Sequence, residues 1–193
     1  MSKSNPTEII AQKFILELNE ALALENAGIE RLQTRVEEIS IPEAKAQMQR
    51  HLQESLQHQQ RLQQMITSLG GEPTDLKLRL PLPSYPDIIV KMMNNSMTKY
   101  EWELKRVEYD MIVENAEVTC YLMLIEKAQI AGGEISNMVD PLSLNLRDEQ
   151  NMVDWIKTNS PAMLTKLWPK IQSSVVASDP SSSTSTSLPT ESQ

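Results

Sequence analysis

The chain has 193 residues and a net charge of −8, with 40% hydrophobic and 23% charged side chains. These values are ordinary for one globular domain, and the acidic balance argues against non-specific binding to nucleic acid. A single cysteine, Cys120, excludes a disulfide framework and a cysteine-based zinc site. Because the sequence shows no secretory signal and no apolar run near the roughly 20 residues that cross a bilayer, we expect a cytoplasmic protein without a membrane partner.

Turn signals and apolar periodicity predict an all-α chain. The segment Asn5-Pro6-Thr7 is typical of a helix start, and the glycine pairs 70–71 and 132–133 are typical of helix ends. Prolines at 73, 81, 83 and 86 predict an extended connection there. The Ser/Thr/Pro-rich residues 173–193 predict a disordered tail. We expect helices at about 7–38, 43–69, 87–94, 98–131, 141–158 and 161–172.

The lengths of the connections predict how the long helices are arranged. Short turns join the first helix to the second and the third long helix to the fourth, so each pair should form an antiparallel hairpin. The 72–97 segment would be a long crossover between the hairpins. This pattern is typical of a ferritin-like four-helix bundle, here with an extra short C-terminal helix, in one domain over 1–172.

Three glutamates occupy positions where an apolar residue is expected. Each lies in a stripe with alternating steps of four and three residues, which places the stripe on one helix face. The stripes are Leu18, Leu22, Glu25, Ile29, Leu32, Val36, Ile39; Tyr100, Leu104, Val107, Met111, Glu114, Val118, Tyr121, Ile125, Ala128; and Leu142, Leu146, Glu149, Val153, Ile156. Burying an unpaired carboxylate costs several kcal/mol, so three such residues predict a shared cation, most simply a metal ion.

Buried ion pairs are the alternative explanation for the three glutamates. Basic residues on the same helices fall outside the stripes, so we favour the metal interpretation. These residues are Arg31, Arg35, Arg50, Lys105 and Arg106.

The helix at 43–69 carries both histidines of the chain on one face, seven residues apart. Glu54 stands three residues after His51 and four before His58, within reach of either. Imidazole and carboxylate groups suit iron, manganese or zinc. The other interpretation is a polar seam facing solvent or a partner: we favour it for His51, and both interpretations stay open for His58.

Several strings resemble the YciE/YciF-type ferritin-like family of stress proteins over roughly residues 10–158. They are Leu24-Glu25-Asn26-Ala27, His51-Leu52-Gln53-Glu54, Gln60-Arg61-Leu62, Leu69-Gly70-Gly71, the helix segment from Val113 to Tyr121, and Leu146-Arg147-Asp148-Glu149. The resemblance implies a four-helix bundle, often a homodimer, with a dinuclear metal site. Carried over by position, it implies that Glu25, Glu114, Glu117 and Glu149 are ligands.

The chain departs from the Glu-x-x-His pattern of di-iron bundles, since Gln57 follows Glu54 and Met152 follows Glu149 at that spacing. Glu117 can bridge two metals or face solvent. Our first hypothesis is an iron or manganese protein that oxidises ferrous iron or removes peroxide in stress defence. The alternative is a non-catalytic helical dimer or scaffold that has lost its metal. The predicted metal ligands are Glu25, Glu54, His58, Glu114, Glu117 and Glu149.

Overall fold

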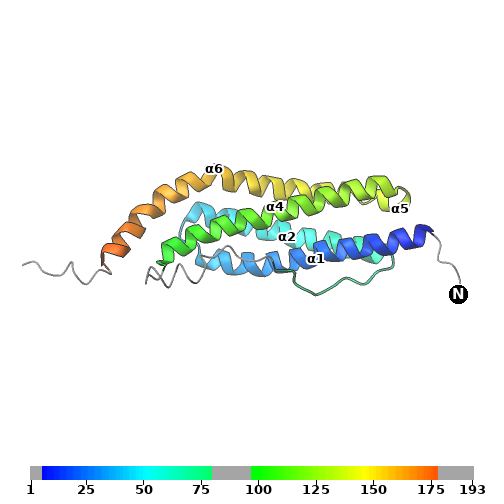
Figure 1. Ribbon diagram of the computed structural model, residues 1–193, viewed down its shortest axis with the longest axis horizontal. Helices are drawn as coiled ribbons and strands as arrows, with labels where there is room; N and C mark the ends of the chain where they lie inside the picture. The colour runs from blue at the N-terminus through cyan, green and yellow to red at the C-terminus, as the bar shows by residue number, and fades with distance from the viewer. Residues whose placement is uncertain (1–5, 80–96, 178–193) are drawn as a thin grey trace, which may run out of the picture.

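The computed structural model describes residues 6–79 and 97–177, and every regular element in these ranges is a helix. The four long helices lie side by side as a bundle (Figure 1), which confirms the predicted ferritin-like architecture. The helix predicted at 87–94 lies outside the described residues. The elements are α1 (Pro6–Glu38), α2 (Pro42–Ser68), α4 (Lys99–Ala131), α5 (Gly133–Ser136) and α6 (Val139–Ala177).

Short, capped connections form the two hairpins. A tight turn joins α1 to α2, and Ser40 in this turn donates its backbone N–H and its hydroxyl to the Glu103 carboxylate of α4. The helix α4 begins with a capping box between Thr98 and Glu101. It ends at Gly132, whose φ of 66° favours glycine. The first hairpin is therefore tied to the second at one end of the bundle.

The start of the crossover runs along α1 and is held there by hydrogen bonds. The Asn19 side chain accepts from the Thr74 N–H, and Asn26 donates to the carbonyls of Thr74 and Leu76. The Leu78 N–H donates to the Ala23 carbonyl in the middle of α1 at 2.8 Å. This extended segment runs along the outer side of α1 in Figure 1, as Pro73 and the glycine pair before it predict.

The last helix corrects one prediction. We expected a break at Ser160-Pro161 and a separate short helix, but α6 runs without interruption from Val139 to Ala177 with two prolines inside it. An internal proline costs about 3 kcal/mol. Burial of Met163, Leu167 and Ile171 against the bundle offsets this cost, and α6 curves in Figure 1. The helix also extends into the segment predicted as tail, of which 178–193 lie outside the described residues.

The bundle interior has two apolar clusters at different heights. One contains Phe14, Leu18, Leu22, Leu62, Ile66, Leu124 and Leu142. The other contains Leu32, Ile39, Met48, Met152, Ile156 and Leu167. Between the two clusters, the buried residues of α2 and α6 are polar, and α1 adds two more, so a polar layer separates the clusters. These residues are Glu25, Asn26, His51, Ser55, His58, Asn145, Asp148 and Glu149. None of the helices in the two described ranges is both long enough and apolar enough to cross a bilayer.

Candidate metal centre

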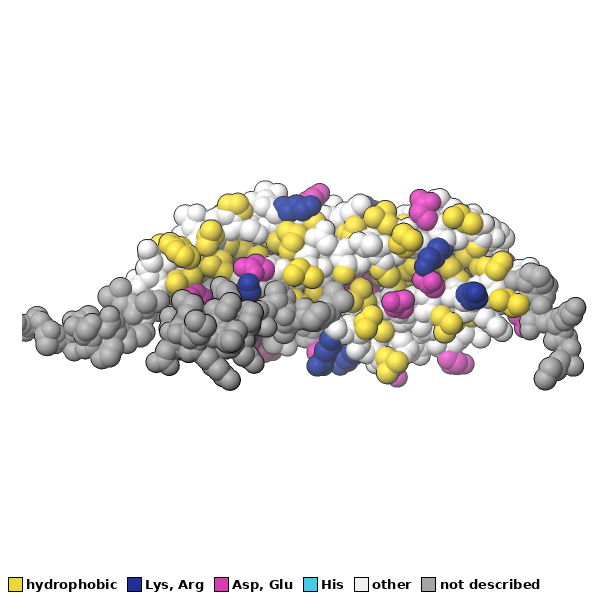
Figure 2. All heavy atoms as spheres, in the orientation of Figure 1, with side chains coloured by type: hydrophobic (Ala, Val, Ile, Leu, Met, Phe, Trp, Pro, Cys, Tyr) yellow, Lys and Arg dark blue, Asp and Glu magenta, His cyan; other side chains and the backbone are white. Residues whose placement is uncertain are grey.

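The polar layer holds an unusual number of ionisable side chains. They are Glu25, His51, His58, Asp110, Glu114, Glu117 and Glu149, each at most 3% exposed. Neither histidine shows on the face drawn in Figure 2. All four long helices contribute to this set, because each supplies a polar residue at a stripe position that points inward. Buried charges need partners, so the contacts within the layer decide what it does.

Glu149 lies at the centre of the layer, and its two carboxylate oxygens face different histidines. Oε1 lies 2.9 Å from His58 Nδ1, and Oε2 lies 3.4 Å from His51 Nε2. Each histidine also faces a second glutamate. The result is two three-residue groups that share Glu149, namely Glu25–His58–Glu149 and His51–Glu114–Glu149. Within each group the potential ligand atoms lie within 4.8 Å of one another, so each group could hold a metal ion.

The first group, which we call the His58 half, has unused acceptors. Glu25 Oε1 lies 3.1 Å from His58 Nδ1 and accepts a hydrogen bond from the Tyr121 hydroxyl. Because His58 Nδ1 carries at most one proton, Glu25 and Glu149 compete for it. Glu25 Oε2 is buried without a hydrogen-bond partner in the described structure, and the two Glu149 oxygens face histidine nitrogens without a well-directed hydrogen bond. Unpartnered buried carboxylate oxygens are costly, and a metal ion would satisfy them.

The second group, the His51 half, already contains a permanent cation. Glu114 Oε2 lies 2.8 Å from His51 Nε2, and Arg31 donates to Glu114 Oε1 at 2.7 Å. The Arg31 guanidinium also binds Asp110, which Arg35 holds from the other side at 3.1 Å. Both oxygens of Glu114 therefore have donors. The sequence argument against buried ion pairs was wrong for Glu114, because the long Arg31 side chain reaches it from outside the stripe.

Each histidine has a further carboxylate at its outer nitrogen. His51 Nδ1 lies 3.1 Å from Glu54, and His58 Nε2 lies 3.4 Å from Asp148. Arg147 and Arg61 in turn lie 3.0 Å and 4.0 Å from Asp148. A carboxylate in this position fixes the orientation and the tautomer of a histidine that binds metal through its other nitrogen.

Without metal, the two histidines add positive charge to that of Arg31 and Arg35. Burial alone would lower the pKa of His58, but contacts with Glu149 and Glu25 outweigh burial and raise this pKa to about 10. Burial also opposes the charged form of His51, and its contacts with Glu114 raise its pKa well above the usual value. For Glu114, His51 and Arg31 overcome the effect of burial and hold the pKa far below its ordinary value.

The pKa values of two other carboxyl groups of the layer are raised, in contrast to that of Glu114. Burial raises the pKa of Glu149 to about 7, although His51 and His58 oppose this shift. Burial, together with the charges of Glu149 and Glu25, raises the pKa of Glu117 well above its usual value. Both carboxyl groups therefore keep a proton more readily than an exposed glutamate does, and a metal ion would have to displace such protons.

Comparison with protein families shows which family this chain belongs to. A family model described as "Domain of unknown function (DUF892)" matches residues 10–167. The chain belongs to this family. This match confirms the family resemblance that the sequence motifs indicated. None of the curated proteins compared with this family member is significantly similar to it.

Two solved structures resemble this DUF892 member. A protein from Xanthomonas campestris pv. campestris has a TM-score of 0.65 and 20% sequence identity, with 84% of this chain and 98% of that chain covered. The bacterioferritin of Desulfovibrio desulfuricans has a TM-score of 0.64 and 19% identity, with coverage of 97% and 100%. At these identities the likeness shows the fold, a ferritin-like four-helix bundle.

The DUF892 member brings most of the predicted ligands together. Glu25, His58, Glu114 and Glu149 lie in the two groups, whereas Glu54 lies behind His51 and Glu117 is buried beside the groups but belongs to neither. Which of them bind metal stays a prediction.

Sequence reasoning assigned His51 to a polar seam, yet His51 is fully buried and belongs to the second group. Its position seven residues before His58, on the same helix face, was the available signal. Asp110, Asp148 and the Arg31 contact were also missed. They lie outside the traced stripes, so periodicity alone gave no signal for them.

Proposed function

We propose that this protein binds a pair of iron or manganese ions in the polar layer and acts in the oxidation of ferrous iron or the removal of peroxide. The observation that carries the proposal is the position of Glu149, whose two oxygens lie 2.9 and 3.4 Å from different histidines without a well-directed hydrogen bond to either. In this position Glu149 would be able to serve as a ligand to an ion in either group. Nitrogen and carboxylate ligands without thiolate suit iron and manganese.

Different residues of the chain would have different roles in such a centre. Glu25 with His58, and Glu114 with His51, would each hold one ion, and Glu149 would connect the two ions. A bound iron or manganese pair would supply the change in oxidation state. The apolar clusters on both sides of the layer restrict access of bulk water, and Tyr121 and Arg31 fix the positions of the Glu25 and Glu114 carboxylates.

The fold comparison supports the same proposal in general terms. The bacterioferritin of Desulfovibrio desulfuricans has a diiron site, known in different catalytic states, and that protein shares the bundle architecture. The present chain differs in taking both histidines from α2, where ferritin-like di-iron sites take them from two helices. We therefore propose a related but distinct ligand set. The family resemblance also implies a homodimer, which analytical ultracentrifugation would test.

Elemental analysis of protein purified without chelator, from cells supplied with iron and manganese, tests the proposal directly. We expect about two equivalents of metal per chain, in line with the two groups of potential ligands. The matched variants Glu25→Ala and Glu114→Ala should each lose metal. Metal-free protein that still binds none after anaerobic addition of ferrous iron would contradict the proposal.

One observation favours a second function, that of a metal-free helical scaffold. Arg31 and His51 already occupy both oxygens of Glu114, which balances that carboxylate without metal. Glu114→Leu should lower the unfolding temperature in either case, because Arg31 and His51 lose a buried partner. In a scaffold, added Mn²⁺ should change the unfolding temperature of neither the variant nor the unsubstituted protein. In the metalloprotein, added Mn²⁺ should raise the unfolding temperature of the unsubstituted protein much more than that of the variant.

A further inference from the structure

A cavity of about 330 Å³ lies between α1, α4 and the start of the crossover, on the outer side of the polar layer. We call it the α1–α4 cavity. Its walls include Leu24, Ala27, Gly28, Arg31 and Leu78. A water molecule takes about 30 Å³ of the liquid, so the cavity has room for several waters or for one small molecule with its hydration shell.

Two residues of its wall connect the cavity to the candidate metal centre. A Cβ atom on Gly28 would lie 3.1 Å from Glu117 Oε1, so the bare backbone of Gly28 separates the cavity from that carboxyl group. Arg31 lines the cavity and donates to Glu114 Oε1 at 2.7 Å. The cavity is therefore separated from Glu117 by the Gly28 backbone and from Glu114 by the Arg31 side chain.

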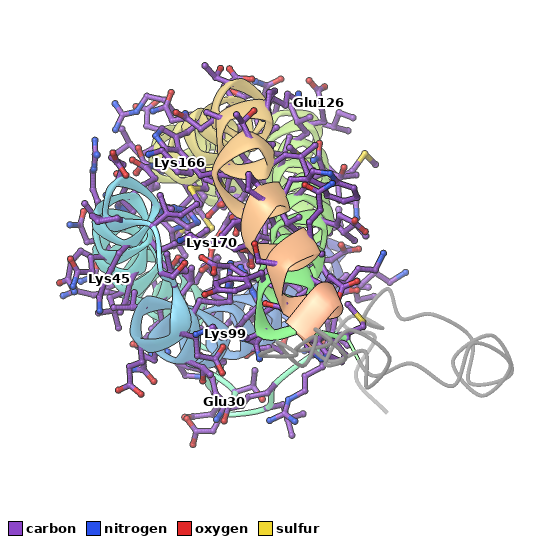
Figure 3. All side chains as sticks on the ribbon, turned by 90° about the vertical axis from the view of Figure 1, so that its left-hand side faces the viewer. Glu30, Lys45, Lys99, Glu126, Lys166 and Lys170 are labelled. Carbon is purple, nitrogen blue, oxygen red and sulfur yellow. The ribbon has the colours of Figure 1, made fainter. Side chains whose placement is uncertain are left out.

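The charges around the cavity disfavour cations. Four arginines line it, against two glutamates, Glu30 and Glu38. Both glutamates are already paired: Glu30 with Lys77 and Arg79, and Glu38 with Arg106. Glu30 lies on the outer side of the bundle in Figure 3, and the side chains of Glu38 and Arg106 are partly exposed, so both pairs lie toward solvent. Arg79 and Arg106 are partners in these pairs, so the outer charges balance, and the excess positive charge of the lining comes from Arg31 and Arg35. A hydrated divalent ion would find no unpaired carboxylate among the lining residues.

Deeper in the cavity, the arginines keep spare donors. Arg31 Nε and Arg35 Nη1 are buried and have no acceptor in the described structure, although both side chains bind Asp110. Their remaining N–H groups favour a ligand that accepts hydrogen bonds. A small neutral oxygen species or a small monoanion has this property, and a metal cation does not.

We propose that the α1–α4 cavity is the port through which small neutral molecules and small monoanions reach the centre, whereas metal ions load by another route. This inference rests on the proposed metal centre and adds the class of molecule that approaches it. It assigns Gly28 a specific role, since a side chain there would crowd Glu117.

The test uses azide as a monoanion probe and Co²⁺ as a metal whose visible spectrum reports its ligands. The variant Ala27→Phe fills the cavity from a half-buried position that is not itself a proposed ligand. Ala11→Phe is the matched control, since Ala11 is also half-buried on α1 but lies 16 residues away, about 24 Å along the helix. Association of azide with the Co²⁺-loaded proteins and loading of Co²⁺ itself are followed by stopped-flow spectroscopy.

In Ala27→Phe we expect azide to associate at least tenfold more slowly, with Co²⁺ loading within twofold of the unsubstituted protein. Ala11→Phe should change neither rate. The proposed port would be wrong if azide associated with Ala27→Phe at an unchanged rate, or if azide association and Co²⁺ loading slowed equally. If the unsubstituted protein binds no Co²⁺, the proposed function fails and the port fails with it. That result is distinct from bound Co²⁺ with unchanged azide kinetics, which overturns the port alone.

A second variant tests the same proposal without filling the cavity. Arg79→Gln with Arg106→Gln removes two charges at partly exposed positions. We expect azide association to slow several-fold at low ionic strength and the difference to shrink as salt screens the remaining charges. No change at low ionic strength would overturn the charge selectivity of the port.

Discussion

The two halves of the polar layer use the same residue types but differ in how their carboxylates are satisfied. In the His58 half, a neutral Tyr121 hydroxyl is the additional donor to Glu25, and Glu25 Oε2 has no partner in the described structure. In the His51 half, Arg31 brings a permanent positive charge to Glu114. A cation that enters the His51 half must approach this guanidinium. The comparison teaches that one side chain outside the ligand set can make two similar groups unequal, and we expect the His58 half to bind metal more tightly.

The largest expected effect comes from the residue that both halves share. Glu149→Gln removes the carboxylate between the two histidines, and an amide is a far weaker metal ligand. We expect both metal equivalents to be lost in elemental analysis, while circular dichroism still shows the helical bundle. Retention of one full equivalent would show that the halves bind independently of Glu149.

The next largest expected effect distinguishes metal binding in the His58 half from metal binding in the His51 half. Glu25→Gln should abolish the tighter of two binding steps, and Glu114→Gln the weaker one, because Arg31 lies only in the second half. Isothermal titration of metal-free protein with Mn²⁺ under anaerobic conditions measures both steps. If the two variants lose the same step, or if Glu114→Gln removes the tighter one, the proposed asymmetry is wrong.

A smaller effect is expected from the outer carboxylates. Asp148→Asn should weaken the tighter step and Glu54→Gln the weaker step, each by about 10- to 100-fold, because these residues orient the histidines. Asp154→Asn is a matched control on α6, since its side chain is 78% exposed and lies outside the layer. The same titration reports all three variants, and equal effects in Asp154→Asn and Asp148→Asn would contradict an orienting role.

The smallest and most gradual effect is that of pH. The folded pKa of His58, about 10, lies above its unfolded value of about 6.5, so the stability it adds is complete below pH ~6.5 and is lost as pH rises through 10. Glu149 has a pKa of about 7 in the folded state, so between pH ~4.5 and 7 it holds a proton that the unfolded chain has released. This difference also lowers the free energy of unfolding as pH rises.

We therefore expect the unfolding free energy of the metal-free protein to fall between pH 5 and 10, as measured by urea unfolding with a chelator present. Metal must displace the His58 proton, so metal affinity should rise by up to about tenfold per pH unit for each proton released. Stability of the metal-free protein that rises over this range would contradict the charge state assigned to the histidines.

Metal-ligand sequence motifs give only a partial description of this centre. A Glu-x-x-His search fails here, since Gln57 and Met152 stand at the expected histidine positions. The structure instead brings two histidines of one helix, two turns apart, to the two oxygens of a glutamate on another helix. Local spacing cannot reveal this arrangement, because it depends on how α2 and α6 are aligned along the bundle.

The sequence by itself determined the helices, the two hairpins and the inward direction of Glu25, Glu114 and Glu149. These features follow from apolar periodicity and turn residues, which act over a few residues of chain. It did not determine the continuity of α6, where burial of apolar side chains against other helices outweighs the local cost of two prolines.

Only the tertiary structure decided which groups pair across helices. It placed His51 in the centre, put Glu54 and Asp148 behind the histidines, and connected Arg31 to Glu114. Long side chains reach partners that no stripe predicts, and their pairing is set by the distances between helices. The free energy of a buried carboxylate depends on these partners, so the chemistry of the centre emerges only when the bundle is assembled.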